Sequence, residues 1–300
     1  SFCSTVGYKP TYGLISRFGL ISYANSIEQI GPLTRTVKDT AFMLNLIAGI
    51  DPNDNTTINN NNEDYLEGIE SGIEGKKIGI ITEMMGEGID PEVLSATKQA
   101  ISKLEGLGAT CEEVSLDMVK YSVAAYYTIT ATEAGSNLAR YDNLRYGYEM
   151  PVEGYEFNSY ISKARKNFGP EVTRRMIIGG FVPSAGHAGK YFLKAMKVKS
   201  KLTKQINEAF KKFDLLIAPT VPILPFKIGE KIDDPVSLFL VDINTVTANL
   251  TGKPAISIPF KIVNGLPIGI QLLANSMEDK LLLQAAHALE QTVTLPEVPI

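Results

Sequence analysis

The stretch VGYKPTYGLISRFGLISYANSIEQIGPLTRT, residues 6–36, fixes more backbone geometry than any other part of the sequence. Four glycines permit positive φ or close backbone approach within it, and two prolines fix φ and withhold a hydrogen-bond donor. The apolar runs between them are too short for helices, so they predict brief extended segments that line a buried floor. Thr36 and Asp39 then have the spacing of a capping box, which predicts a helix from Val37 to the end signal at Gly49.

The residues that follow alternate between strand and helix patterns. The run GKKIGIITE predicts a buried strand over residues 78–81. Asp90 is an N-cap followed by proline, and the helix that it begins should end at Gly106 or Gly108. Residues 110–116 predict the next strand. This order indicates an α/β architecture with helices packed over a sheet.

The last third of the chain returns to strands. Its expected elements are a strand at Asp214–Thr220, a helix near Ser237–Leu250, two strands at Ala255–Lys261 and Leu266–Leu273 joined by an Asn264-Gly265 turn, and a closing helix that begins with a capping box of Ser276 and Asp279. No internal repeat and no linker separates these elements. We therefore expect a single domain over residues 1–300, with a mixed β-sheet covered by helices.

The middle third, residues 119–215, has helical patterns and many tyrosines. Its last part, Lys190–Phe213, is basic and amphipathic, which is typical of membrane-surface or nucleic-acid-binding helices as well as of ordinary surface helices. The interleaved Gln205 and Glu208 favour a surface helix with a solvated basic face. The Asn-rich segment Asp51–Tyr65 has no apolar period and predicts an exposed loop.

Composition describes an ordinary globular protein: 300 residues, 44% hydrophobic, 21% charged, with a net charge of −4. That charge is too weak to indicate wrapping of nucleic acid, and no cluster of basic and aromatic residues predicts a strand-binding groove. Cys3 and Cys111 predict no disulfide framework and lack metal-ligand spacing, so a reducing, cytoplasmic setting is expected. No signal peptide and no membrane span is predicted. The chain does not begin with Met and starts inside a dense motif, so we expect it to be a piece of a longer protein.

The sequence lacks the common catalytic and nucleotide-binding motifs: there is no G-x-S-x-G, no G-x-x-x-x-G-K-[ST], no G-x-G-x-x-G and no H-E-x-x-H. His187 falls in a loop pattern without an evident partner, and His287 falls within a helical pattern. These two residues do not predict a serine-histidine triad. Cys111, at the start of a strand, is interpreted as a small buried hydrophobe and not as a nucleophile.

Several motifs, in this order and spacing, resemble those of the amidase signature family, and within it the glutamine-dependent A subunits of glutamyl-tRNA(Gln) amidotransferases. They are KPTYG, SRFGL, QIGPLTRTVKD, DPNDNTT, GEGID, SNLARYDNLRYGY, FGPEVTRR, IAPT, IDDP and LPIGIQLL. The resemblance covers essentially the whole chain. It implies the amidase signature fold, N-terminally truncated.

The resemblance also implies the reaction chemistry. Members of this family use a Ser, cis-Ser, Lys arrangement, in which the lysine acts as base through the middle serine on a nucleophilic serine, and backbone N–H groups form an oxyanion hole. In the family's motif order the nucleophile falls a few residues before the position of Ser1, and the other two residues fall further upstream. We therefore assign no catalytic residue within this chain. No serine or lysine of this chain is assigned a catalytic role instead.

The residues that the resemblance implies for substrate recognition lie within this chain. Segment by segment, it implies that Arg175 meets the α-carboxylate of glutamine and that Asp242 meets the α-amino group. Tyr126 is implied nearby, with the neighbouring Tyr127 as an alternative. A guanidinium pairs with a carboxylate in a bidentate way, and a carboxylate accepts from an ammonium group, so the residue types suit these roles. A surface or structural ion pair is the competing interpretation for each charged residue.

The function implied is that of a glutaminase subunit, which hydrolyses glutamine and supplies ammonia for converting Glu-tRNA(Gln) to Gln-tRNA(Gln). The expected partners are the amidotransferase B and C subunits, with the tRNA bound mainly through the former. No cofactor or metal is expected in this chain, because the resemblance implies that the ATP and Mg²⁺ chemistry belongs to the B subunit. A stand-alone amidase for small amides, or a non-catalytic scaffold on the same fold, are the alternatives.

Overall fold

The computed structural model describes residues 1–86, 88–142, 144–148, 151, 153–184, 186, 190–230, 238 and 240–295. They divide into two units by their internal packing. The first comprises residues 1–19, 29–123 and 200–300, and the second comprises residues 20–28 and 124–199. The expectation of a single domain over residues 1–300 stays a prediction.

A mixed seven-stranded sheet is the centre of the first unit. Its strands lie in the order β2-β1-β6-β7-β5-β3-β4. Their bounds are β1 Val6–Lys9, β2 Leu33–Thr34, β3 Lys77–Ile81, β4 Thr110–Val114, β5 Leu215–Pro219, β6 Ala255–Val263 and β7 Leu266–Ala274. Strand β3 runs parallel to β4 and β5, and the other pairs are antiparallel. The predicted mixed α/β sheet is therefore confirmed.

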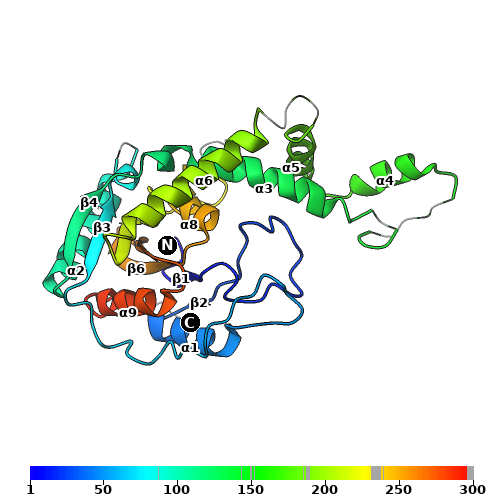
Figure 1. Ribbon diagram of the computed structural model, residues 1–300. Coiled ribbons are helices and arrows are strands. Elements are labelled where there is room, and N and C mark those ends of the chain that lie inside the picture. Colours follow the sequence, from blue (N-terminus) through cyan, green and yellow to red (C-terminus); the bar gives the residue numbers. More distant parts are fainter. Residues whose placement is uncertain are drawn as a thin grey trace. The chain divides into compact units, whose positions relative to one another are not determined.

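Four of the described helices lie wholly within the first unit. They are α1 Val37–Ile47, α2 Pro91–Gly106, α8 Val246–Thr251 and α9 Asp279–Glu290, with two 3-10 turns at Thr82–Met84 and Asp117–Tyr121. Figure 1 shows α9 and α1 side by side, and buried residues of α1, α2 and α9 join those of the strands in one hydrophobic cluster. Burial of these apolar faces is the main source of stability for such a layered unit.

The opening stretch folds largely as its sequence predicts. Thr36 and Asp39 form the capping box at the start of α1. Gly31 lies against β1 so closely that a Cβ atom there would sit 1.8 Å from the carbonyl oxygen of Tyr8, while the Tyr8 amide donates to the Pro32 carbonyl at 3.1 Å. The glycine is needed for close approach of two backbones.

Two predicted helices begin differently from their sequence patterns. The helix expected near Ser237–Leu250 is interrupted, because residues 241–245 form turns and α8 begins at Val246. The capping box of Ser276 and Asp279 does not form: α9 has Glu278 as its N-cap without a side-chain hydrogen bond, and the Ser276 hydroxyl accepts from Lys253 at 3.1 Å. The Asp279 carboxylate is engaged elsewhere in the core, so a tertiary contact outcompetes the local cap.

The other predicted elements are close to the structure. The β6–β7 hairpin turns at Asn264 and Gly265, with φ of 51° and 79°, as required for the mirror-image turn that suits hairpins. Residues 51–65 form neither helix nor strand, as expected for a loop, but Tyr65 at its end is 1% exposed.

The second unit is helical, as the middle third of the sequence predicts. It contains most of α3 (Ser122–Leu138), α4 (Phe157–Arg165), α5 (Pro170–Phe181) and the first part of α6, which runs over Phe192–Ala209. Helices α3 and α5 touch at glycines: a Cβ atom at Gly179 would lie 2.1 Å from the Ala131 carbonyl oxygen, and one at Gly135 would lie 3.1 Å from the Gly179 backbone.

Candidate functional site

Arg175 lies on α5 and is held at two of its nitrogens. Its Nε donates to the Glu171 carboxylate at 2.6 Å, and its Nη1 donates to the Tyr23 hydroxyl at 2.5 Å. The side chain is 30% exposed, so the guanidinium is partly withdrawn from solvent without being sealed in. Such anchoring restricts the rotamers that a long side chain would otherwise sample.

Glu171 is shared by two arginines. Arg174 pairs with it through Nε at 2.9 Å and Nη2 at 2.8 Å, in addition to the bond from Arg175. The hydrogen bonds from Arg174 and then Arg175 lower the pKa of Glu171 to about 2, although partial burial opposes this. Burial alone would lower the pKa of Arg175, but its bonds to Glu171 and Tyr23 raise it above the ordinary value. Glu171 and Arg175 are therefore both charged at any physiological pH.

Tyr23 is itself fixed by the segment that carries it. Its carbonyl accepts from Asn137 of α3 at 3.0 Å, and its amide donates to Glu28 at 2.9 Å. The amide of Ser26 donates to Glu133 of α3 at 3.0 Å. Residues 20–28 are thus bonded to α3 at two points, and this positions the hydroxyl that accepts from Arg175.

The Arg175 guanidinium has a third nitrogen, Nη2, besides the two that Glu171 and Tyr23 hold. Among the described residues, no hydrogen bond reaches its Nη2. A planar guanidinium presents its donors in a fixed fork that matches carboxylate geometry. The arrangement can therefore bind a carboxylate while Glu171 and Tyr23 hold the rest of the group in place.

Tyr126 and Tyr127 lie on α3, in the same unit as Arg175. Their rings pack edge to face, with centroids 5.2 Å apart and an interplanar angle of 88°, and both side chains are half-buried. This contact holds the two rings against each other.

Asp242 belongs to the first unit. It lies in the turn before α8, where its carbonyl accepts from the amides of Thr245 at 3.0 Å and Val246 at 3.1 Å. The turn is tied to the sheet by buried bonds: Asn244 donates to the Pro219 carbonyl at 3.0 Å, and Gln271 donates to the Asn244 carbonyl at 3.1 Å. The backbone that carries the Asp242 carboxylate is therefore fixed by strands β5 and β7.

Cys111, expected to be a small buried hydrophobe, is half-buried. Burial raises the pKa of Cys111 to about 11, which disfavours the reactive thiolate. His287 is 6% exposed on α9, with Nδ1 3.5 Å from the Glu290 carboxylate. His187 lies outside the described residues. In the described part of the chain, no group of three or more His, Cys, Asp or Glu residues could hold a metal, and no helix is long and apolar enough to cross a membrane.

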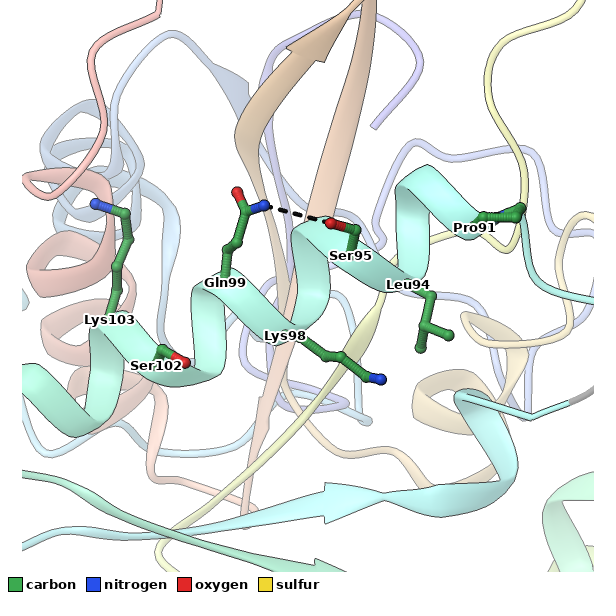
Figure 2. Close-up of a pocket in the computed structure, with 7 residues that line it drawn as sticks. All are labelled: Pro91, Leu94, Ser95, Lys98, Gln99, Ser102 and Lys103. Atoms are coloured by element: carbon green, nitrogen blue, oxygen red, sulfur yellow. Dashed lines mark hydrogen bonds between the residues drawn. The ribbon is translucent and has the colours of Figure 1, made fainter.

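A surface hollow of about 630 Å³ lies over the outward face of α2 (Figure 2). Its lining residues are Pro91, Leu94, Ser95, Lys98, Gln99, Ser102 and Lys103. Gln99 donates to the Ser95 hydroxyl at 3.3 Å, and Figure 2 shows the side chains pointing outward along one helix. Groups from a single helix face do not converge as those of a binding pocket do, so we assign it no function.

Sequence reasoning missed two residues that hold the candidate site. Glu171 precedes Arg175 by four positions on one helix, and this spacing is a readable signal for an ion pair. Tyr23 is 152 positions away from Arg175 in sequence, and no local pattern connects them.

Comparison with known proteins places the chain in a family. A sequence profile of the amidase family matches residues 1–283. The A subunit of glutamyl-tRNA(Gln) amidotransferase from Cenarchaeum symbiosum is 64% identical over 299 residues, which are 100% of this chain and 62% of that protein. The protein of the same name from Methanosarcina mazei is 47% identical, over 97% of this chain and 61% of its own length.

Solved structures show the same fold. The crystal structure of the A subunit of glutamyl-tRNA(Gln) amidotransferase from Thermotoga maritima matches with a TM-score of 0.79 and 41% identity, covering 97% of this chain and 58% of that one. A bacterial aryl acylamidase, at 22% identity, matches with a TM-score of 0.77 over 97% of this chain and 58% of its own. The mixed sheet with its covering helices is thus the α/β fold of amidase signature enzymes.

The chain belongs to the amidase signature family, as its motifs predict. It spans about 60% of the length of the relatives that it matches.

Proposed function

We propose that this chain is the glutamine-recognition part of a glutaminase subunit in a tRNA-dependent amidotransferase. The relatives named above support the amidotransferase role, and the held guanidinium of Arg175 supports recognition of a carboxylate. In this proposal the subunit hydrolyses glutamine and supplies ammonia for converting Glu-tRNA(Gln) to Gln-tRNA(Gln).

The proposal rests mainly on Arg175. Glu171 and Tyr23 hold its Nε and Nη1, and no hydrogen bond from the described residues reaches its Nη2. Arg175 would bind the α-carboxylate of glutamine. Asp242 would accept from the α-amino group, and Tyr126 or Tyr127 would lie beside the substrate. A site that binds both charged ends of the substrate distinguishes an amino acid from a simple amide, because a simple amide has neither charged group.

Hydrolysis itself is assigned to a Ser, cis-Ser, Lys arrangement outside this chain. We propose the B and C subunits of the amidotransferase as partners, with the tRNA, ATP and Mg²⁺ held mainly by the former. The free thiols of Cys3 and Cys111 suit a reducing cytoplasm. The chain by itself should hydrolyse no glutamine, because residues that act as a unit lose about 10⁶-fold in turnover when they are removed.

Calorimetry with the purified chain tests the recognition step. L-glutamine should bind at least about tenfold more tightly than its α-carboxamide, which lacks the charged carboxylate, and Arg175→Ala should abolish that preference. Arg174→Ala is the matched control, since Arg174 pairs with the same Glu171 and should leave the preference intact. Equal affinity of the unaltered chain for both compounds contradicts glutamine recognition. The remaining alternatives are then a stand-alone amidase for small amides and a non-catalytic scaffold.

A further inference from the structure

Charge is strongly segregated along this chain. Residues 157–199 contain nine Lys and Arg residues and one acidic residue, Glu171, which gives a net charge of +8 in a chain of net −4. The net charge of the whole chain conceals this segment, and the basic pattern at Lys190–Phe213 is equally typical of an ordinary surface helix. A basic segment in an acidic protein is a footprint for a polyanion.

Two exposed aromatic rings lie within this basic segment of the second unit. Phe181, at the end of α5, is 52% exposed, and Tyr191, just before α6, is 38% exposed. Their centroids are 6.2 Å apart, with the ring planes inclined by 39°. Exposed rings of this size are costly to hydrate and offer flat faces for stacking.

Three lysines lie close to Tyr191 in the sequence. The Lys190 Nζ lies 5.4 Å from the centroid of the Tyr191 ring. Lys194 and Lys197 are exposed and three residues apart on α6, so they share one face of the helix. We call Phe181, Lys190, Tyr191, Lys194 and Lys197 the basic–aromatic patch.

We propose that the basic–aromatic patch binds a single-stranded segment of RNA. Unpaired bases stack on the rings of Phe181 and Tyr191, and the three lysines neutralise phosphates of the backbone. The inference rests on the proposed function, because the relatives are named for a tRNA, and it assigns part of the tRNA contact to this chain and not only to the B subunit. A bilayer surface is a weaker match: Leu193 and Met196 of α6 are exposed among these lysines, but the names of the relatives point to a tRNA.

Fluorescence anisotropy with a labelled single-stranded oligoribonucleotide and an unmodified tRNA transcript tests the proposal. The triple variant Lys190→Gln/Lys194→Gln/Lys197→Gln should bind both at least about tenfold more weakly at moderate salt, and the slope of log affinity against log salt should fall by about 2. Phe181→Leu/Tyr191→Leu should weaken binding about tenfold with the slope unchanged, because stacking releases no counterions.

The matched control removes the same charge from the first unit: Lys38→Gln/Lys98→Gln/Lys212→Gln should change RNA affinity less than about twofold. An equal loss in this control overturns the proposal, as does equal affinity for double-stranded DNA. Binding of phosphatidylserine vesicles with no binding of RNA assigns the patch to a membrane and also overturns it. L-glutamine binding by the triple variant should be unchanged, so a failure of glutamine recognition and a failure of RNA binding appear in separate measurements.

Discussion

Asp279, the first residue of α9, accepts a hydrogen bond from the backbone amide of Thr11 at 2.9 Å, across 268 positions of sequence. The hydroxyls of Thr11 and Tyr8 donate to the same carboxylate, Tyr8 at 2.6 Å. All three residues are at most 4% exposed. Burial raises the pKa of Asp279, while the hydrogen bonds from Thr11 and Tyr8 act in the opposite direction. Tyr8 of β1 and Thr11 of the K-P-T-Y-G motif thus hold the start of the closing helix.

Asp279→Ala should destabilise the first unit by roughly 3 kcal/mol, because it leaves three buried donors without an acceptor. Ser276→Ala, the other member of the expected capping box, should cost less than about 1 kcal/mol. Urea denaturation of the two variants gives both values. Similar losses would mean that local capping, and not the buried contact, sets the start of α9.

This contrast shows what the sequence can and cannot predict about the fold. Local signals identify the capping box at Thr36, the hairpin turn at Asn264 and Gly265, and the start of α2 after Asp90, because each depends on residues within a few positions. The role of Asp279 depends on a partner near the other end of the chain. The capping-box spacing therefore pairs Asp279 with Ser276, whereas its partner in the structure is Thr11.

Gly179→Ala should destabilise the second unit by about 1 to 3 kcal/mol, because the added Cβ would lie 2.1 Å from the Ala131 carbonyl oxygen and would force α3 and α5 apart. Gly180→Ala is a matched control on the same helix, where a Cβ meets nothing within 4 Å. It should be neutral or stabilise by up to about 1 kcal/mol through helix propensity. Thermal melts monitored by circular dichroism compare the two; a Gly180→Ala loss as large as that of Gly179→Ala would contradict the close crossing.

The D-P-N-D-N-T-T motif should give the first unit an acid-sensitive contact at Asp54. Its carboxylate accepts from the Arg17 amide at 2.8 Å and from Thr56, and these bonds lower its pKa to about 2. An acid whose pKa is lowered by folding stabilises the fold above its unfolded pKa of about 3.8, and that stabilisation is lost as the pH falls toward 2.

Asp54→Asn should therefore lower the free energy of unfolding by about 1 to 2 kcal/mol at about pH 6, and the difference from the unaltered chain should shrink as the pH falls below 3.8. Urea titrations at about pH 6 and about pH 3, on either side of the unfolded pKa, measure it. A difference that stays constant with pH would show that the charge of Asp54 is not what matters.

The candidate site could be predicted only in part. The family motif indicates Arg175 directly, and its neighbour Glu171 follows from helix spacing. Tyr23 could not be found in this way, because a chain segment 152 positions away has to dock on α3 before its hydroxyl reaches the guanidinium. The position of Asp242 depends on the turn before α8, for which the sequence pattern predicts a helix.

Arg175 should act on the part of glutamine that does not react, and this gives the sharpest test in a complete subunit, with the serine and lysine segment joined to this chain. Arg175→Ala should lower kcat/KM for glutamine by an amount equivalent to about 2 to 5 kcal/mol, because the substrate carboxylate loses a partner in a partly desolvated site. Hydrolysis of a simple acyl ester without charged ends should be nearly unchanged. Arg175→Lys should restore only part of the loss, since an ammonium group cannot reproduce the planar fork.

Asp242→Asn should show the same selective loss through the α-amino end, and Arg174→Ala should leave both substrates nearly unaffected despite its shared bond to Glu171. The measurement is the pair of kcat/KM values, for glutamine and for the ester, in each variant. Equal losses on both substrates for Arg175→Ala would make its bonds to Glu171 and Tyr23 structural, because a residue that only supports the fold affects every substrate alike.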